Sequence, residues 1–186
     1  MDQLSDKELV AKIQANKNDH KSFELLIIRH QEKLYSFIRR MLQNHEDTND
    51  VLQNVFLKAW KYLNKFDGRS SFYTWIYRIA YNETIDQLNK NKKHFHQELS
   101  DVKLESELAD TNSTIPTSEE ISNKLFVAIN TLPDKQKLVF NMKYFENKKY
   151  TEISHITGTS EGALKASYFH AVKKIEAFLK NDQTFL

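Results

Sequence analysis

Apolar residues recur at spacings of three and four along almost the whole chain, which is the period of an amphipathic α-helix. The clearest run lies in the first quarter, where the apolar positions are Phe23, Leu26, Ile27, Leu34, Phe37, Ile38, Met41 and Leu42. The 186 residues include only three glycines and two prolines, which are too few for the tight turns of a many-stranded sandwich or barrel. We therefore expect an all-α protein.

Helix-start signals appear at several of these runs. Ser5 and Glu8 have the spacing of a capping box, in which each side chain bonds to the other residue's backbone N–H. Asp19 can cap a second helix, and Ser70 or Ser71 can cap a fourth, after a third apolar run. The sequence thus predicts four helices in the first half of the chain.

The helical period divides the chain into two small domains. We expect a first helical domain over residues 1–94 and a second over residues 121–186. Between them, residues 95–120 are polar and lack a sustained apolar stripe, which indicates a flexible linker. A short amphipathic turn around Leu99–Leu108 is the one element expected there.

The net charge of +2 conceals an uneven distribution. Residues 1–94 hold 16 Lys or Arg and 12 Asp or Glu, and residues 121–186 hold 10 and 6. The linker at 95–120 holds one basic and seven acidic residues. Two basic domains joined by an acidic linker are compatible with binding to a polyanion.

Residues 150–179 have the pattern of a helix-turn-helix. Gly158 stands where the turn requires a positive φ, and Ser160 can cap the second helix. The apolar stripe of that helix is Leu164, Tyr168, Ala171 and Ile175. The residues off the stripe are Lys165, Ser167, Phe169, His170, Lys173 and Lys174. The pattern favours a helix that enters the DNA major groove, or two helices of an ordinary bundle.

Aromatic residues crowd the segment 66–82, with Arg69 and Arg78 among them. The aromatic residues are Phe66, Phe72, Tyr73, Trp75, Tyr77 and Tyr81. Aromatic faces beside cations suit unpaired bases, and each stacked base contributes about 1–3 kcal/mol. The spacing of Phe72 and Trp75 with Ile76 and Ile79 also fits a core stripe. Tyr73, Tyr77 and Tyr81 form a second row, which a core alone explains less well.

A further helical segment, 47–63, combines polar and large apolar residues. These are Asp50, Gln53, Asn54 and Lys58 together with Phe56 and Trp60. The pattern indicates a solvated face or a surface that docks another protein.

Signals for catalysis or metal binding are weak. The absence of cysteine removes disulfides, thiolate nucleophiles and Cys-ligated metals, and the few glycines leave no phosphate-binding loop. His94 and His96 lie in the predicted linker without a recognisable third ligand. We therefore expect no enzymatic activity, no metal and no cofactor.

The sequence contains no apolar run of about 18 residues that could span a membrane. Its acidic, polar start does not have the zones of a signal peptide. We expect a cytoplasmic protein that does not insert into the membrane.

The motifs, in this order, resemble the extracytoplasmic-function (ECF) group of the sigma-70 family, the small two-domain initiation factors of bacterial RNA polymerase. The resemblance covers about residues 23–91, as a sigma-2 domain, and about residues 125–179, as a sigma-4 domain. The matching stretches of the first are NDVLQNVFLKAW and FDGRSSFYTWIYRIAYN. Those of the second are LPDKQKLVFNMKYFENKKYTEIS and GTSEGALKASYFHAVKKI.

The resemblance implies three interfaces. The polymerase clamp would dock on Asp50, Gln53, Phe56 and Trp60. The −10 element would be melted and captured by Arg69, Tyr73, Trp75, Tyr77, Arg78 and Asn82. The −35 element would be read by Ser160, Lys165, Ser167, Phe169, His170, Lys173 and Lys174. The implied partners are core RNA polymerase (clamp and flap), promoter DNA and an anti-sigma factor, and the acidic linker would thread toward the polymerase active cleft.

The second domain departs from the family at four positions. Many relatives carry arginine where this chain has Ser167 and His170, and threonine and valine where it has Ala163 and Leu164. Arg is the commonest bidentate reader of guanine. The resemblance therefore predicts a different −35 sequence, or more use of backbone contacts and DNA shape.

The leading interpretation is a sigma factor that directs promoter-specific initiation. The alternative is a helix-turn-helix regulator that acts without joining the polymerase, which would leave the first domain unexplained. An enzyme or ligand-binding bundle would require a convergent polar pocket that the sequence does not indicate.

Overall fold

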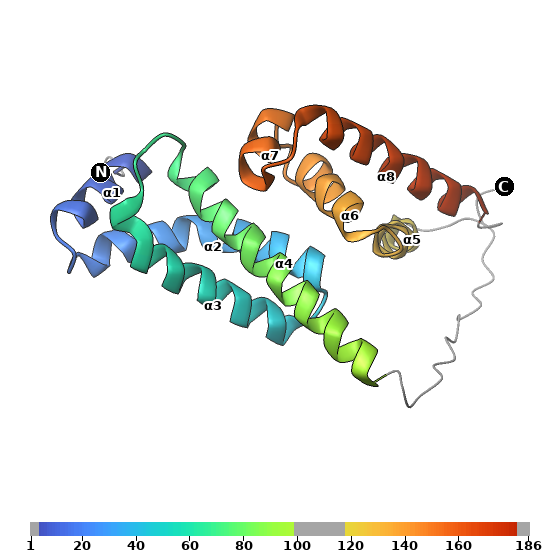
Figure 1. The fold of residues 1–186 in the computed structure, drawn as a ribbon, viewed down its shortest axis with the longest axis horizontal. Coiled ribbons are helices and arrows are strands. Elements are labelled where there is room, and N and C mark those ends of the chain that lie inside the picture. Colours follow the sequence, from blue (N-terminus) through green and yellow to red (C-terminus); the bar gives the residue numbers. More distant parts are fainter. Residues whose placement is uncertain (1–3, 99–117, 182–186) are drawn as a thin grey trace. The chain divides into compact units, whose positions relative to one another are not determined.

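The computed structural model describes residues 4–98 and 118–181, which form helices and turns with no β-strand among them. They divide into two compact units, one built from α1 to α4 and the other from α5 to α8 (Figure 1). The all-α prediction with two helical units is confirmed. The turn expected at Leu99–Leu108 lies outside the described residues.

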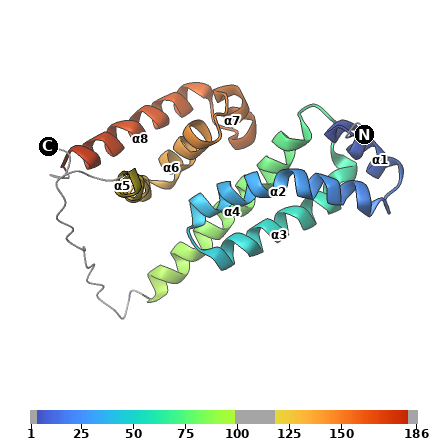
Figure 2. The same ribbon diagram turned by 180° about the vertical axis from the view of Figure 1, so that it is seen from behind.

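The first unit contains the helices that the apolar periods predicted. Its elements are α1 (Asp6–Ala15), α2 (His20–Leu42), α3 (His45–Tyr62), the 3₁₀ turn η1 (Leu63–Lys65) and α4 (Phe72–Glu98). α2 packs along α3, and α1 packs on α2 (Figure 2). Gln43 ends α2 in the left-handed conformation (φ 61°), which lets the chain reverse within two residues.

The predicted caps begin these helices. Ser5 and Glu8 form both halves of the capping box of α1. Asp19 accepts a hydrogen bond from the backbone N–H of Ser22 at 3.1 Å, and Ser71 accepts one from the N–H of Thr74 at 3.1 Å. These bonds satisfy backbone donors that the first turn of a helix leaves unpaired.

The core of the first unit draws on all four of its α-helices. Its fully buried members include Leu9, Leu26, Leu34, Phe37, Ile38, Val55, Ala59, Ile76, Tyr77 and Ala80. Farther along, Asp47 of α3 accepts hydrogen bonds from Gln87 at 3.1 Å and from Asn91 at 2.8 Å. These bonds fasten the second half of α4 to the start of α3.

Helix α4 runs four residues past the predicted end of the first domain. No glycine or proline interrupts residues 69–98, so no local signal stops the helix at position 94. His94 and His96 consequently lie in the last turns of α4 and not in a linker. After the predicted linker, α5 begins at Ser118, two residues after Pro116 and three residues before the predicted start of the second domain at residue 121.

The second unit is formed by α5 (Ser118–Asn130), α6 (Asp134–Phe140), the wider π-type turn η2 (Asn141–Phe145), α7 (Tyr150–Thr157) and α8 (Glu161–Asn181). α8 packs against both α5 and α6. Their shared core contains Ala128, Ile129, Leu132, Phe140, Ala171 and Ile175. The predicted stripe of α8 therefore faces this core.

Within the described ranges, no helix has the length and apolar character that crossing a membrane requires.

Candidate nucleic-acid and protein interfaces

Three aromatic rings form a cluster where α4 begins. The Trp75 ring lies 5.3 Å from that of Phe66 and 5.8 Å from that of Phe72, centroid to centroid. Phe72 is 3% exposed and anchors the cluster in the core, whereas Phe66 and Trp75 are half-buried. Phe72 is therefore a core residue, and the partly open rings of the cluster are Phe66 and Trp75.

Tyr73 and Tyr77 occupy very different environments although they share a flank of α4. Tyr73 is half-buried and packs edge-on to Tyr77 at 5.6 Å. Tyr77 is fully buried, with its ring 4.7 Å from that of Phe37 in α2. The core interpretation of the second aromatic row therefore holds at Tyr77, because this ring is buried against α2. In this structure Tyr77 supports Tyr73 and does not itself present a ring to DNA.

The turn between η1 and α4 presents its polar groups to solvent. Gly68 has a φ of 72°, the left-handed value that its position in the turn requires. Asp67 accepts from the backbone N–H of Arg69 at 3.1 Å and pairs with its side chain at 3.0 Å. The Arg69 side chain is 89% exposed, so its charge is available to a phosphate.

A cavity of about 690 Å³ lies between α1 and this turn. Its walls include Val10 and Gln14 from α1, and Phe66, Gly68 and Phe72 from the turn and the start of α4. The cavity thus combines aromatic and apolar side chains with polar and charged residues such as Asp6, Arg29 and Ser70.

The exposed face of α4 continues beyond the cluster. Arg78 and Asn82 are both exposed and lie one helical turn apart. Beside Asn82 is a groove of about 460 Å³ between α3 and α4, crossed by an ion pair between Lys58 and Glu83. Arg78 and Asn82 therefore stand on an open surface.

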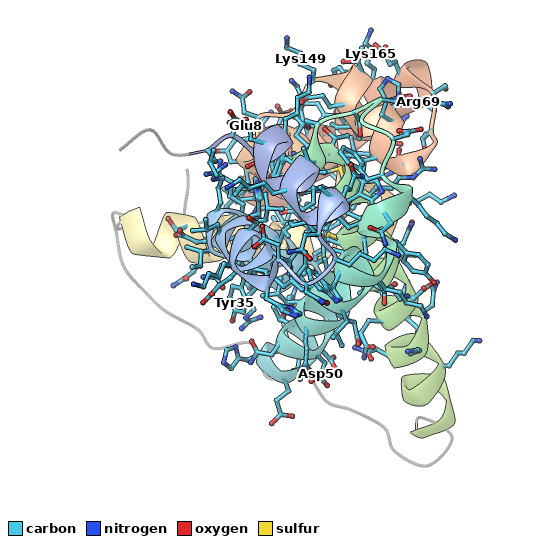
Figure 3. The ribbon with its side chains drawn as sticks, turned by 90° about the vertical axis from the view of Figure 1, so that its left-hand side faces the viewer. Glu8, Tyr35, Asp50, Arg69, Lys149 and Lys165 are labelled. Carbon is cyan, nitrogen blue, oxygen red and sulfur yellow. The ribbon has the colours of Figure 1, made fainter. Side chains whose placement is uncertain are left out.

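The predicted docking face on α3 is partly exposed. Asp50 and Gln53 are exposed, and Figure 3 shows the Asp50 side chain projecting away from the helix. Phe56 is half-buried. Leu57, which the sequence analysis did not single out, has 61% of its surface exposed. Its signal in the sequence is its position four residues after Gln53, on the same side of the helix.

Trp60 is held within the first unit. Its ring stacks on that of His20 at 4.9 Å and 25°, and lies 4.9 Å from that of Phe23. Trp60 therefore joins the end of α3 to the start of α2, and only part of its surface is available to a partner.

The helix-turn-helix has the geometry that its sequence predicts. α7 ends at Thr157 and is capped by Gly158, whose φ is 70°. Ser160 accepts a hydrogen bond from the N–H of Ala163 at 3.4 Å, so this predicted DNA contact also caps α8. Leu164, Ala171 and Ile175 are buried. The exposed side chains of α8 include Lys165, Phe169, His170, Lys173 and Lys174, while Ser167 is half-buried.

Lysine ammonium groups lie over two aromatic rings of the second unit, the exposed Phe169 and the half-buried Tyr150. Lys173 lies 4.6 Å from the centre of the Phe169 ring. Lys143 and Lys165 lie 5.2 Å and 5.7 Å from the centre of the Tyr150 ring, and burial raises the pKa of Tyr150. Lys149 and Lys165 project in the same direction in Figure 3. The sequence analysis did not single out Lys143 and Lys149, because both precede residue 150, where the predicted helix-turn-helix begins.

Gly162, in the first turn of α8, faces open space, since a Cβ at this position would meet nothing within 4 Å.

Among the described residues, no group of three or more His, Asp or Glu side chains is arranged to hold a metal ion.

Comparison with known proteins gives matches in both units. The sequence matches the family Sigma-70 region 2 over residues 26–94 and the family Sigma-70, region 4 over residues 122–175. It is 31% identical over 185 residues to the ECF RNA polymerase sigma-E factor of Escherichia coli strain K12, covering 94% of each chain. The corresponding sigma-E factor of Haemophilus influenzae is 30% identical, with 94% of this chain and 95% of that protein covered.

Two solved structures share the fold. The sigma factor RpoE of Bartonella quintana, in complex with the anti-sigma factor NepR, has a TM-score of 0.68 and 21% identity, covering 87% of this chain and 99% of that one. CnrH, in complex with the cytosolic domain of CnrY, has a TM-score of 0.70 and 20% identity, covering 95% and 98%.

A helical unit with an aromatic, cationic helix start and a second unit with a helix-turn-helix define a DNA-binding initiation factor of two domains. The chain belongs to the sigma-70 family, within its extracytoplasmic-function group. As a sigma factor it directs transcription initiation, and the alternative of a regulator that never joins the polymerase is not supported. Sigma factors are non-enzymatic initiation factors.

Proposed function

We propose that the two units divide promoter recognition between them, with the first opening the −10 element and the second reading the −35 element. The observation that carries this proposal is the half-buried Trp75 in contact with Phe66 and Phe72, in the helix that follows the turn of the exposed Arg69. A rigid, partly open ring beside a cation can stack an unpaired base while the cation binds its phosphate. Tyr73, Arg78 and Asn82 extend this surface along α4.

The energetics of this arrangement suit promoter opening that is driven by base binding and not by nucleotide hydrolysis. Unstacking a base costs a few kcal/mol, and stacking it on an aromatic side chain returns about 1–3 kcal/mol. Captured bases can therefore offset most of the cost of melting. On this basis we assign the chain no catalytic activity and no cofactor.

The −35 element is assigned to the exposed face of α8. Lys165, Lys173 and Lys174 supply phosphate contacts, and Phe169 and His170 lie between them on the exposed surface. Ser160 and Ser167 add hydroxyl groups along the same helix. Because this face has no arginine, we expect base readout with fewer bidentate guanine contacts than in many relatives.

Core polymerase is assigned to α3. Asp50, Gln53, the exposed Leu57 and the open part of Phe56 form a polar face with an apolar centre, and Trp60 stabilises its end. Such a composition is typical of a protein interface. We place the protein in the cytoplasm, where its polymerase lies. By analogy with RpoE and NepR, we also propose that an anti-sigma factor binds this chain.

The test is reconstituted transcription with the cognate core polymerase and a library of genomic fragments. We expect specific start sites whose upstream DNA shares one −10 and one −35 sequence. The absence of any specific start, with core binding intact, would refute the proposed division of promoter recognition.

A further inference from the structure

Gln14, on the exposed side of α1, holds the segment that leads into the 66–71 turn. Its side-chain Nε2 donates to the carbonyl oxygen of Leu63 at 3.0 Å and to that of Phe66 at 2.9 Å. These acceptors lie 49 and 52 residues later in the sequence. A single amide thus ties the first residue of η1, and the residue that follows η1, to α1 immediately before Asp67.

After Phe66, the hydrogen bonds of residues 67–71 in the described part of the chain are short-range. Asp67 bonds to Arg69, and Ser71 bonds to Thr74 in the first turn of α4. These bonds shape the turn but do not fix its position relative to the rest of the first unit. The Gln14 bonds supply that long-range attachment.

The N-terminal end of α1 is connected, through side chains of α2, to Phe72 and Tyr73 at the start of α4. Asp6 is 2.5 Å from Arg29 Nη1 and 2.8 Å from Nε2 of the buried His30. The His30 ring in turn stacks on Tyr73 at 5.4 Å and lies 5.6 Å from the ring of Phe72. α1 therefore supports the motif on both sides, at Phe66 and at Tyr73.

α1 is also firmly held in place. Leu9, Val10 and Ile13 of this helix have at most 4% of their surface exposed. The capping box satisfies backbone N–H groups at its start. Most of this helix precedes the Gln14 contact, and all of it precedes residues 26–94, the part of the chain that matches Sigma-70 region 2. A rigid helix outside the matched region thus forms one wall of the cavity beside the turn.

We propose that Gln14 is a positioning residue for −10 recognition, which acts by fixing the Phe66 carbonyl and with it the 66–71 turn. The proposal rests on the assignment of the −10 element to this turn and to the start of α4. It predicts that Gln14 affects the choice of −10 bases more than it affects core binding or stability.

The experiment uses holoenzyme made from core polymerase and the full chain, with a promoter obtained by the start-site mapping above. Open-complex formation is measured on that promoter and on versions with single −10 substitutions, and the ratio of the two is the discrimination. The variants are Gln14→Ala, Gln14→Glu and Gln14→Lys. Gln31→Ala, at an exposed glutamine of α2, is the matched control.

We expect Gln14→Ala to lower discrimination about tenfold, because two hydrogen bonds that fix the turn are lost. Gln14→Glu should lower it further, because a carboxylate would face two carbonyl oxygens. Gln14→Lys should restore much of it, since an ammonium group can donate to both acceptors. Gln31→Ala should match wild type.

Unchanged discrimination in Gln14→Ala and Gln14→Glu would overturn the inference. An equal loss on all templates, with the ratio preserved and a lowered melting temperature, would also overturn it, since that is the result of a purely structural role. If wild type discriminates at −10 while the Gln14 variants do so equally well, the proposed function stands and only this inference falls. If wild type does not discriminate at −10, the proposed function is refuted, and the inference that rests on it is refuted with it.

Discussion

The imidazole of His30 stacks on the ring of Tyr73, with centroids 5.4 Å apart and planes inclined by 28°. His30 is buried, and its Nε2 lies 2.8 Å from the carboxylate of Asp6. A titratable ring therefore supports one of the residues assigned to −10 DNA. Arg29 and Lys33, on the same helix as His30, add positive charge nearby.

The burial of His30 makes the stability of the first unit depend on pH in a defined direction. Burial lowers the pKa of His30 below its ordinary value of 6.5, while Asp6 opposes the shift. Because the folded pKa lies below the unfolded one, the contribution of His30 to stability is fully present above about pH 6.5 and is lost as the pH falls through the folded pKa. We expect His30→Gln to show a smaller fall in the free energy of unfolding between neutral and mildly acidic pH. Parallel pH profiles for wild type and variant in urea titrations would contradict this.

Tyr73 and Tyr77 should respond differently to truncation. Tyr77→Ala should cost about 3–5 kcal/mol of unfolding free energy, because it leaves a cavity beside Phe37. Tyr73→Ala should cost only about 1–2 kcal/mol, because the ring is half-buried, and should mainly impair opening of −10 DNA. Denaturant unfolding gives the first comparison and open-complex assays give the second. Equal destabilisation by the two changes would show that Tyr73 is also a core residue.

Trp75→Ala should separate core binding from promoter opening. The change removes the ring between Phe66 and Phe72 while α3, the proposed polymerase face, is untouched. We expect core affinity within about twofold of wild type, and loss of permanganate reactivity at −10 thymines, because each stacked base contributes about 1–3 kcal/mol. Trp75→Phe, which keeps an aromatic face, is the control and should retain part of the opening. Full permanganate reactivity in Trp75→Ala would refute the assignment.

Lys165→Ala should weaken binding to −35 DNA through a phosphate. We expect the slope of log affinity against log salt to fall by about one, with similar losses on cognate and unrelated duplexes. Lys135→Ala, an exposed lysine of α6 outside the recognition helix, should leave the slope unchanged. Fluorescence anisotropy with labelled duplexes at several salt concentrations measures both. A loss confined to the cognate sequence would instead identify Lys165 as a base reader.

Local chemistry explains why much of the architecture was predictable. Ser5, Asp19, Ser71 and Ser160 cap helices because a side-chain oxygen placed just before a helix can reach its free N–H groups. Gly158 ends α7 because its turn needs a positive φ. Each of these effects acts over about four residues, so a linear reading of the chain detects it.

Other features depend on residues far apart in the chain. Periodicity placed Tyr73 and Tyr77 on one flank of a helix, but the crossing of α2 buried Tyr77 against Phe37 and left Tyr73 half-exposed. Trp60 has the spacing of a docking residue, yet His20 and Phe23 occupy much of its surface.

The motif order and the helical periods were thus sufficient to predict the all-α fold class, the presence of two helical units and the resemblance to the sigma-70 family. Which aromatic ring is core and which is open, and that Gln14 holds a turn 52 residues away, were decided by how the helices pack. The physical reason is range: caps and periods act between neighbours in the chain, whereas burial and long-range hydrogen bonds depend on surfaces that meet only in the folded protein.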